Sequence, residues 1–136
     1  MERNQPQRGQ SLVEFAIILP VLLIIAAGAL DLGRLYFSYV AITDAASEGA
    51  AYAAAHPRDE SAVVARARDA STITAADSDV EYFCPTCPAV SSGDPITVTV
   101  TYSFTLATPI VEAIVPGGVI PLRAVATEAI LGGALE

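Results

Sequence analysis

Residues Leu12–Leu30 read LVEFAIILPVLLIIAAGAL, an apolar stretch in which Glu14 is the one ionisable residue. At about 1.5 Å of rise per residue, a helix of this length is about 28 Å long, which is close to the thickness of a bilayer's hydrocarbon core. Arg3 and Arg8 precede it. Because positively charged residues favour the cytoplasmic side, we expect a single-pass anchor in the cytoplasmic membrane. Its N-terminus would be cytoplasmic and residues 31–136 periplasmic or extracellular.

A removable secretory signal peptide is the alternative interpretation of the same stretch. Ala27-Gly28-Ala29 resembles a small-residue cleavage site, and cleavage there would release an exported soluble binding domain without residues 1–29. Against this, Glu14 would lie inside the apolar core of the signal, and the run Phe15–Leu30 is at the long end for one. We therefore favour a retained anchor, in which an ionisable residue is by default a functional hypothesis.

Pro20 interrupts the apolar stretch and has no N–H to donate, so the carbonyl of Ala16 loses its usual helical partner. This predicts a helix kink that would let the helix bend during packing. The other interpretation is a proline that a transmembrane helix simply tolerates.

The composition of the whole chain argues for a membrane protein without catalysis. Of 136 residues, 53% are apolar, and seven arginines without any lysine face fifteen acids, giving a net charge of −8. Such a chain will not bind the phosphate backbone of a nucleic acid non-specifically. One histidine and two cysteines leave little material for a metal site or a nucleophile. We expect no enzyme activity, no cofactor and no metal.

A short motif stands at the membrane edge, where Arg8-Gly9 precedes the apolar helix and Glu14 is the fifth residue after Gly9. This resembles the processing site of type IV pilin-like proteins, which prepilin peptidase cuts after the glycine. The segments RGQSLVEFAIILPVLLIIAAGALDLGRLYF and AASEGAAYAA make residues 8–55 similar to TadE-like pilus-assembly proteins, the pseudopilins of the tight-adherence (Flp-type) pilus system. The combination is more specific than the glycine–glutamate spacing alone.

The resemblance implies cleavage between Gly9 and Gln10, so that a new α-amine lies four residues before Glu14. It implies that Glu14 pairs with such an amine, on its own chain or a neighbour's, and so sets the register of packed subunits in a low-dielectric medium. The alternative role for Glu14 is a solvated acid at headgroup level. Type IV pilins proper usually begin with Phe, whereas this chain offers Gln10. The implied partners are the bilayer, prepilin peptidase, the pilus assembly machinery and other pilin or pseudopilin subunits in a homo- or hetero-oligomer.

Helical periodicity continues beyond the apolar stretch and predicts one helix from Ser11 to about Ala55, roughly 67 Å long. His56-Pro57 should end it, since the residue before a proline is pushed out of the helical region. One stripe of this helix is aromatic and another is mostly small, which favours close packing. The first stripe is Leu32, Tyr36, Tyr39 and Thr43, and the second is Leu35, Ile42, Ala46, Gly49 and Ala53.

The remaining chain predicts a short helix and a small sheet. Asp59-Glu60-Ser61 resembles a helix start, and that helix should run to about Ser71. Ile96–Phe104 alternates apolar and polar residues, the clearest strand in the chain, and its apolar face should cover the small face of the long helix. Further strands are predicted at 80–83 and at 121–131, a loop at 72–79, and a short helix or loop at 108–115.

Together these elements predict an α+β fold in which a long N-terminal helix packs against a small antiparallel sheet, as in the type IV pilin architecture. The expected organisation is a cytoplasmic leader (1–9), a transmembrane helix (10–30), a continuation of that helix as a spine (31–58), and a small α+β ectodomain (59–136).

Cys84-Pro85-Thr86-Cys87 is the one cysteine pair, and its spacing fits a redox dithiol, half of a zinc site or a small disulfide loop. A zinc site needs four ligands, so this one would require dimerisation. In a redox dithiol the cysteines usually stand between a strand and a helix, whose N-terminus lowers the pKa of a thiol. Here Pro85 and Pro88 indicate a loop instead. Because thiols beyond the cytoplasmic membrane oxidise, we favour a local disulfide between Cys84 and Cys87 over redox activity.

Overall fold

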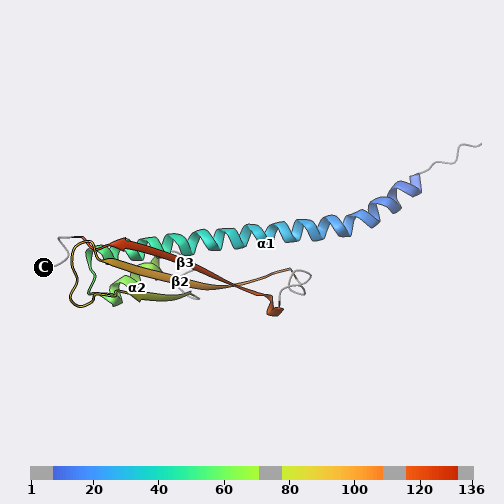
Figure 1. Cartoon of the computed structure of the whole chain (residues 1–136). Coiled ribbons are helices and arrows are strands. Elements are labelled where there is room, and N and C mark those ends of the chain that lie inside the picture. Colours follow the sequence, from blue (N-terminus) through green and yellow to red (C-terminus); the bar gives the residue numbers. More distant parts are fainter. Residues whose placement is uncertain (1–7, 71–77, 109–115, 132–136) are drawn as a thin grey trace, which may run out of the picture.

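The computed structural model describes residues 8–70, 78–108 and 116–131. A single long helix, α1, extends along the molecule, and the other elements gather beside its C-terminal half (Figure 1). This is the predicted α+β layout, with a long helix packed against a small antiparallel sheet. The elements in chain order are α1 (Arg8–Ala55), α2 (Glu60–Asp69), β1 (Ser78–Phe83), β2 (Pro95–Thr105), a short 3-10 turn η1 (Pro116–Gly118) and β3 (Val119–Ala129).

Helix α1 ends at the predicted residue, Ala55, and it begins at Arg8, three residues before the predicted start at Ser11. It continues through Pro20 without a break, and Figure 1 shows it bending in its blue N-terminal part. At the other end, the backbone N–H of His56 donates to the carbonyl of Tyr52 at 3.0 Å, and the imidazole stacks on the Tyr52 ring. Pro57 follows and cannot extend the helical hydrogen bonds.

Helix α2 begins where the acidic segment predicted it. The Asp59 carboxylate accepts a hydrogen bond from the backbone N–H of Ala62 at 3.0 Å, which satisfies one of the unpaired donors of the first turn. Val63 and Ala67 are buried and join the core beneath α1. The helix ends at Asp69, two residues before the predicted end.

The sheet has three antiparallel strands in the order β1-β2-β3. On β2 the alternation predicted from the sequence is confirmed, because Ile96, Val98 and Val100 are buried in the core shared with α1. Strand β3 runs from Val119 to Ala129, two residues earlier at each end than predicted. The short helix or loop predicted at 108–115 lies outside the described residues, apart from Thr108.

One boundary of the sheet was predicted wrongly. Ser78 and Asp79 were assigned to a loop, but they belong to β1, where they pair with Tyr102 and Thr101 of β2. Hydrogen bonds to a long neighbouring strand stabilise extended backbone there although both residues are polar, so pairing overrides local preference. The rest of that predicted loop lies outside the described residues.

The core depends on close approach between α1, α2 and β2. The α1 residues that face the sheet are mostly alanines, and Gly49 stands among them. A Cβ at Gly49 would lie 2.9 Å from the Cβ of Ala67 and 3.2 Å from Cγ1 of Val98. The small stripe predicted from the sequence is therefore the packing face of the helix, and glycine is required at its tightest point.

Candidate functional site: the exposed helix and its junction with the sheet

The N-terminal half of α1 is the most distinctive surface of the molecule. Every residue from Gly9 to Ala26 is exposed, including large side chains such as Phe15, Ile17 and Leu23. The most apolar window of the helix has no buried part, so this is not the covered core helix of a soluble domain. It is a candidate membrane span by length and composition, a test that a signal sequence near the N-terminus also passes.

The residues of the predicted processing motif lie together at the start of this helix. Gly9 is in the first turn, with open space where a Cβ would stand. The side-chain amide of Gln10 donates to the Glu14 carboxylate at 3.2 Å, as expected for residues four apart on a helix. The structure therefore brings Gln10 and Glu14 together on one exposed face. Cleavage at Gly9 and a register role for Glu14 remain predictions.

A second arrangement lies directly after the apolar stretch, where Asp31 joins α1 to the segment that follows β2. Its side chain is buried, with 4% of the residue exposed. The carboxylate accepts hydrogen bonds from the backbone N–H groups of Thr108 at 3.0 Å and Ala107 at 3.3 Å, and Arg34 lies 3.4 Å away. The Thr108 hydroxyl also donates to the carbonyl of Ala27 at 3.5 Å.

The electrostatics of this junction favour the charged form of Asp31. The Thr108 side chain, the N–H groups of Ala107 and Thr108, and the charge of Arg34 lower the pKa of Asp31, while desolvation acts in the opposite sense. In the sequence, Asp31 is notable only as the first residue after the predicted transmembrane helix. The backbone N–H groups that its carboxylate binds lie more than seventy positions away in the chain.

The cysteine pair is bonded and lies against the turn that follows α1. The Sγ atoms of Cys84 and Cys87 are 2.01 Å apart, the distance of a disulfide. The Tyr82 hydroxyl donates to the carbonyl of Pro57 and lies 3.8 Å from Cys87 Sγ. Burial, and then the nearby charge of Glu60, raise the pKa of Tyr82, so its hydroxyl stays protonated as a donor. The disulfide thus holds a loop beside the helix end.

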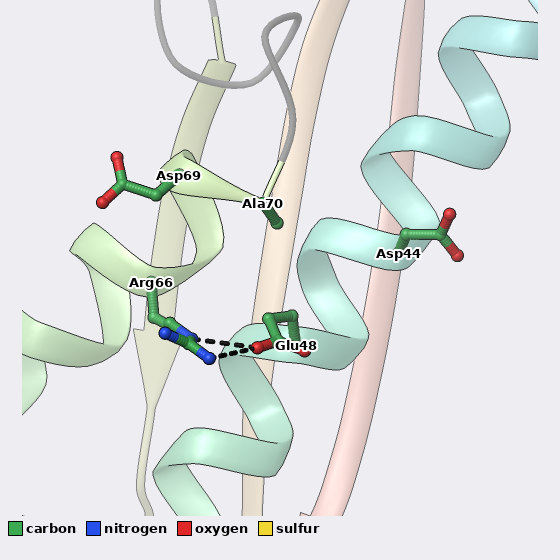
Figure 2. A pocket seen from close by; sticks show the side chains of 5 residues that line it. All are labelled: Asp44, Glu48, Arg66, Asp69 and Ala70. Carbon is green, nitrogen blue, oxygen red and sulfur yellow. Dashed lines mark hydrogen bonds and ion pairs between the residues drawn. The ribbon is translucent and has the colours of Figure 1, made fainter.

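A shallow cleft between α1 and α2 gathers charged side chains without forming a site. Figure 2 shows the Arg66 guanidinium directed at Glu48, with Asp44 and Asp69 pointing away on opposite sides. The Arg66–Glu48 distances are 2.9 Å from Nε and 2.8 Å from Nη2 to the same carboxylate oxygen. Both side chains are about half exposed, so the pair adds little stability. Across 8–70, 78–108 and 116–131, no three His, Cys, Asp or Glu side chains are placed to hold a metal ion.

Comparison with known proteins points to the same part of the chain. A family model described as TadE-like protein matches residues 9–51. The match begins at Gly9 of the predicted processing motif, lies within α1, and includes both the exposed half of the helix and most of its packing face. It confirms the resemblance seen in the sequence. No curated protein and no solved structure gives a significant match.

Proposed function

We propose that this chain is a membrane-anchored, pseudopilin-like structural subunit that acts in assembly of a type IV (Tad/Flp) pilus or a related surface filament. The observation that carries the proposal is the exposed apolar half of α1, which begins at Gly9 where the TadE-like match also begins. The role is structural rather than catalytic. Its partners are the bilayer, the pilus assembly machinery and other pilin or pseudopilin subunits.

In this proposal prepilin peptidase cuts after Gly9 on the cytoplasmic face of the membrane. The cut removes a leader that contains Arg3 and Arg8 and leaves Gln10 as the first residue. Helix α1 then stays in the membrane, and the sheet lies on the periplasmic or extracellular side, in accord with the positive-inside rule.

Glu14 then sets the register between neighbouring subunits. In the uncut chain its carboxylate already meets the side chain of residue 10 at 3.2 Å. Cleavage would place a positively charged α-amine on that same residue, within reach of Glu14 of the same or a neighbouring helix. An ion pair in a low-dielectric medium is costly to separate, which favours one axial alignment of packed helices.

The defining experiment is the intact mass and the N-terminal peptide of the protein purified from its native membrane. A chain that starts at Gln10 and keeps its apolar helix supports the proposal. A start near Leu30 or Asp31 would instead identify an exported soluble domain. Gly9→Val should block cleavage after residue 9. The matched variant Gly28→Val, within the alternative signal-peptide site Ala27-Gly28-Ala29, should leave that cleavage unchanged.

A further inference from the structure

A groove opens between α1 and the end of β2, next to the Asp31 junction. It has a volume of about 510 Å³ and is lined mainly by apolar side chains, with Arg34 as its one cation. Gly33 lies in its helical wall, where nothing stands within 4 Å of the place a Cβ would take. The missing side chain helps to keep the groove open. The rest of the lining consists of Ala29, Leu30, Phe37, Ser38, Tyr102 and Phe104.

The groove lies at the level of lipid headgroups if α1 spans the membrane as proposed. Leu30 is the last residue of the apolar stretch and is 72% exposed, and Phe37 is 67% exposed. Seven residues of helix separate them by about 10 Å, which is longer than the roughly 5–8 Å depth of one headgroup layer. The groove therefore extends from the hydrocarbon edge through the headgroup layer, in either orientation of the chain.

The chemistry of the groove matches a lipid phosphate. The Arg34 guanidinium lies over the Phe104 ring, 5.5 Å from its centroid, which positions the cation at the groove. Its contact with Asp31 involves Nη1, and the planar fork of five N–H donors suits bidentate binding of phosphate oxygens. The Asp31 carboxylate accepts two backbone N–H bonds, and its contact with Arg34 uses one of the three guanidinium nitrogens.

We propose that this groove binds an anionic phospholipid, with Arg34 on the phosphate and the start of an acyl chain against Ala29 and Leu30. Two arguments favour lipid over a protein segment as the occupant. The lining is apolar at the end where α1 leaves the hydrocarbon and cationic one turn further on, which is the polarity order of a phospholipid. Among the residues that line the groove, Arg34 is the one charged side chain, and its positive charge favours a negative headgroup.

The test uses the full chain reconstituted in nanodiscs that hold equal amounts of phosphatidylglycerol and phosphatidylcholine. Native mass spectrometry then counts the lipids of each kind that stay bound after release. Both lipids carry a phosphate and differ in net charge. We therefore expect the wild type to retain phosphatidylglycerol over phosphatidylcholine by about fivefold, the scale of the attraction between one arginine and an anionic membrane surface. Arg34→Gln should bring the ratio close to one, and Arg34→Lys should keep part of it.

Two further variants separate lipid binding from folding. Gly33→Leu keeps Arg34 but fills the groove, and should lower the retention of both lipids. Arg66→Gln removes a cation far from the groove and should change nothing. The proposal is overturned if the wild type shows no preference, if Arg34→Gln keeps it, or if millimolar inorganic phosphate abolishes it, which would assign the site to a free anion. Extraction of the wild type from vesicles by carbonate would instead refute the membrane span itself.

Discussion

The Asp31 carboxylate accepts a hydrogen bond from the backbone N–H of Thr108 at 3.0 Å, across 77 positions of the chain. This contact attaches the segment that follows β2 to α1 at the residue directly after the apolar stretch. It fixes where the sheet begins relative to the exposed apolar half of the helix.

Replacing Asp31 should therefore loosen this attachment. Asp31→Asn keeps the shape and one acceptor oxygen but removes the charge, so the bonds from Ala107 and Thr108 weaken. We expect faster hydrogen exchange of those two N–H groups and a lower unfolding temperature. Asp44→Asn, at an exposed position of the same helix, is the control and should leave both measurements unchanged. Unaltered exchange at Thr108 in Asp31→Asn would contradict the role assigned to the carboxylate.

Acid should weaken the fold, because it protonates carboxylates that accept hydrogen bonds in the folded chain. The pKa values of Asp31 and Asp59 are lowered in the folded chain, Asp31 chiefly by the Thr108 side chain and Asp59 chiefly by the N–H of Ala62. Each carboxylate therefore contributes its full stability above its ordinary pKa of 3.8, and that contribution is lost as pH falls through the lower folded value. Thermal unfolding followed from pH 6 to pH 2 measures the loss. The Asp31→Asn variant should show a shallower decline than the wild type.

Gly49 should tolerate no side chain. Gly49→Val would force atoms between α1, Ala67 and Val98, because even a Cβ meets Ala67 at 2.9 Å. We expect a loss of about 1–3 kcal/mol in the free energy of unfolding, typical of an overpacked core. Gly33→Ala, where nothing lies within 4 Å, should instead be neutral or slightly stabilising, since alanine favours helix. Chemical denaturation in detergent measures both, and equal effects at the two positions would refute the packing argument.

Glu14 should matter for assembly and not for insertion. Glu14→Ala removes the carboxylate that we propose to pair with a subunit amine, and it makes the apolar stretch more favourable in lipid. We expect normal resistance to carbonate extraction together with a marked loss of co-purifying pilin or pseudopilin subunits. Glu81→Gln, on an exposed position of β1, serves as the control. Unchanged subunit recovery from Glu14→Ala would contradict the register role.

The Cys84–Cys87 disulfide should make a modest contribution to the free energy of unfolding. The Cys84→Ser/Cys87→Ser double variant opens a loop of sequence separation 3, which constrains few unfolded conformations. The free energy of unfolding should fall by less than the roughly 3 kcal/mol expected of a 15-residue loop. Assembly into filaments should persist under oxidising conditions. A loss of assembly without a loss of stability would instead indicate a thiol-redox role for the pair.

Local patterns predicted much of this fold. The extent of α1, the Asp59 cap and the alternation along β2 each depend on residues close in sequence, so periodicity and end signals suffice to place them. The strand assignment of Ser78 and Asp79 needed knowledge of their pairing with Tyr102 and Thr101, and the sequence around them carries no such signal.

The candidate site also has one part that the sequence predicts and another part that it does not. Gly9, Gln10 and Glu14 are visible as a motif because helical geometry brings residues four apart together. The Asp31 junction and the Arg34 groove combine α1 with the far end of β2. Their partners are chosen by the tertiary fold, which a single sequence does not display.

The sheet is joined to α1 at both ends of the spine. Asp31 holds it beside the end of the apolar stretch, and the backbone N–H of Leu131 donates to the carbonyl of Ala54 at 2.9 Å at the far end. About 35 Å of helix lies between these two attachments. A force along the helix axis would therefore load the helix–sheet contact in shear between two fixed points. If the chain is a filament subunit as proposed, the sheet and the C-terminal half of α1 would move as one rigid body under tension.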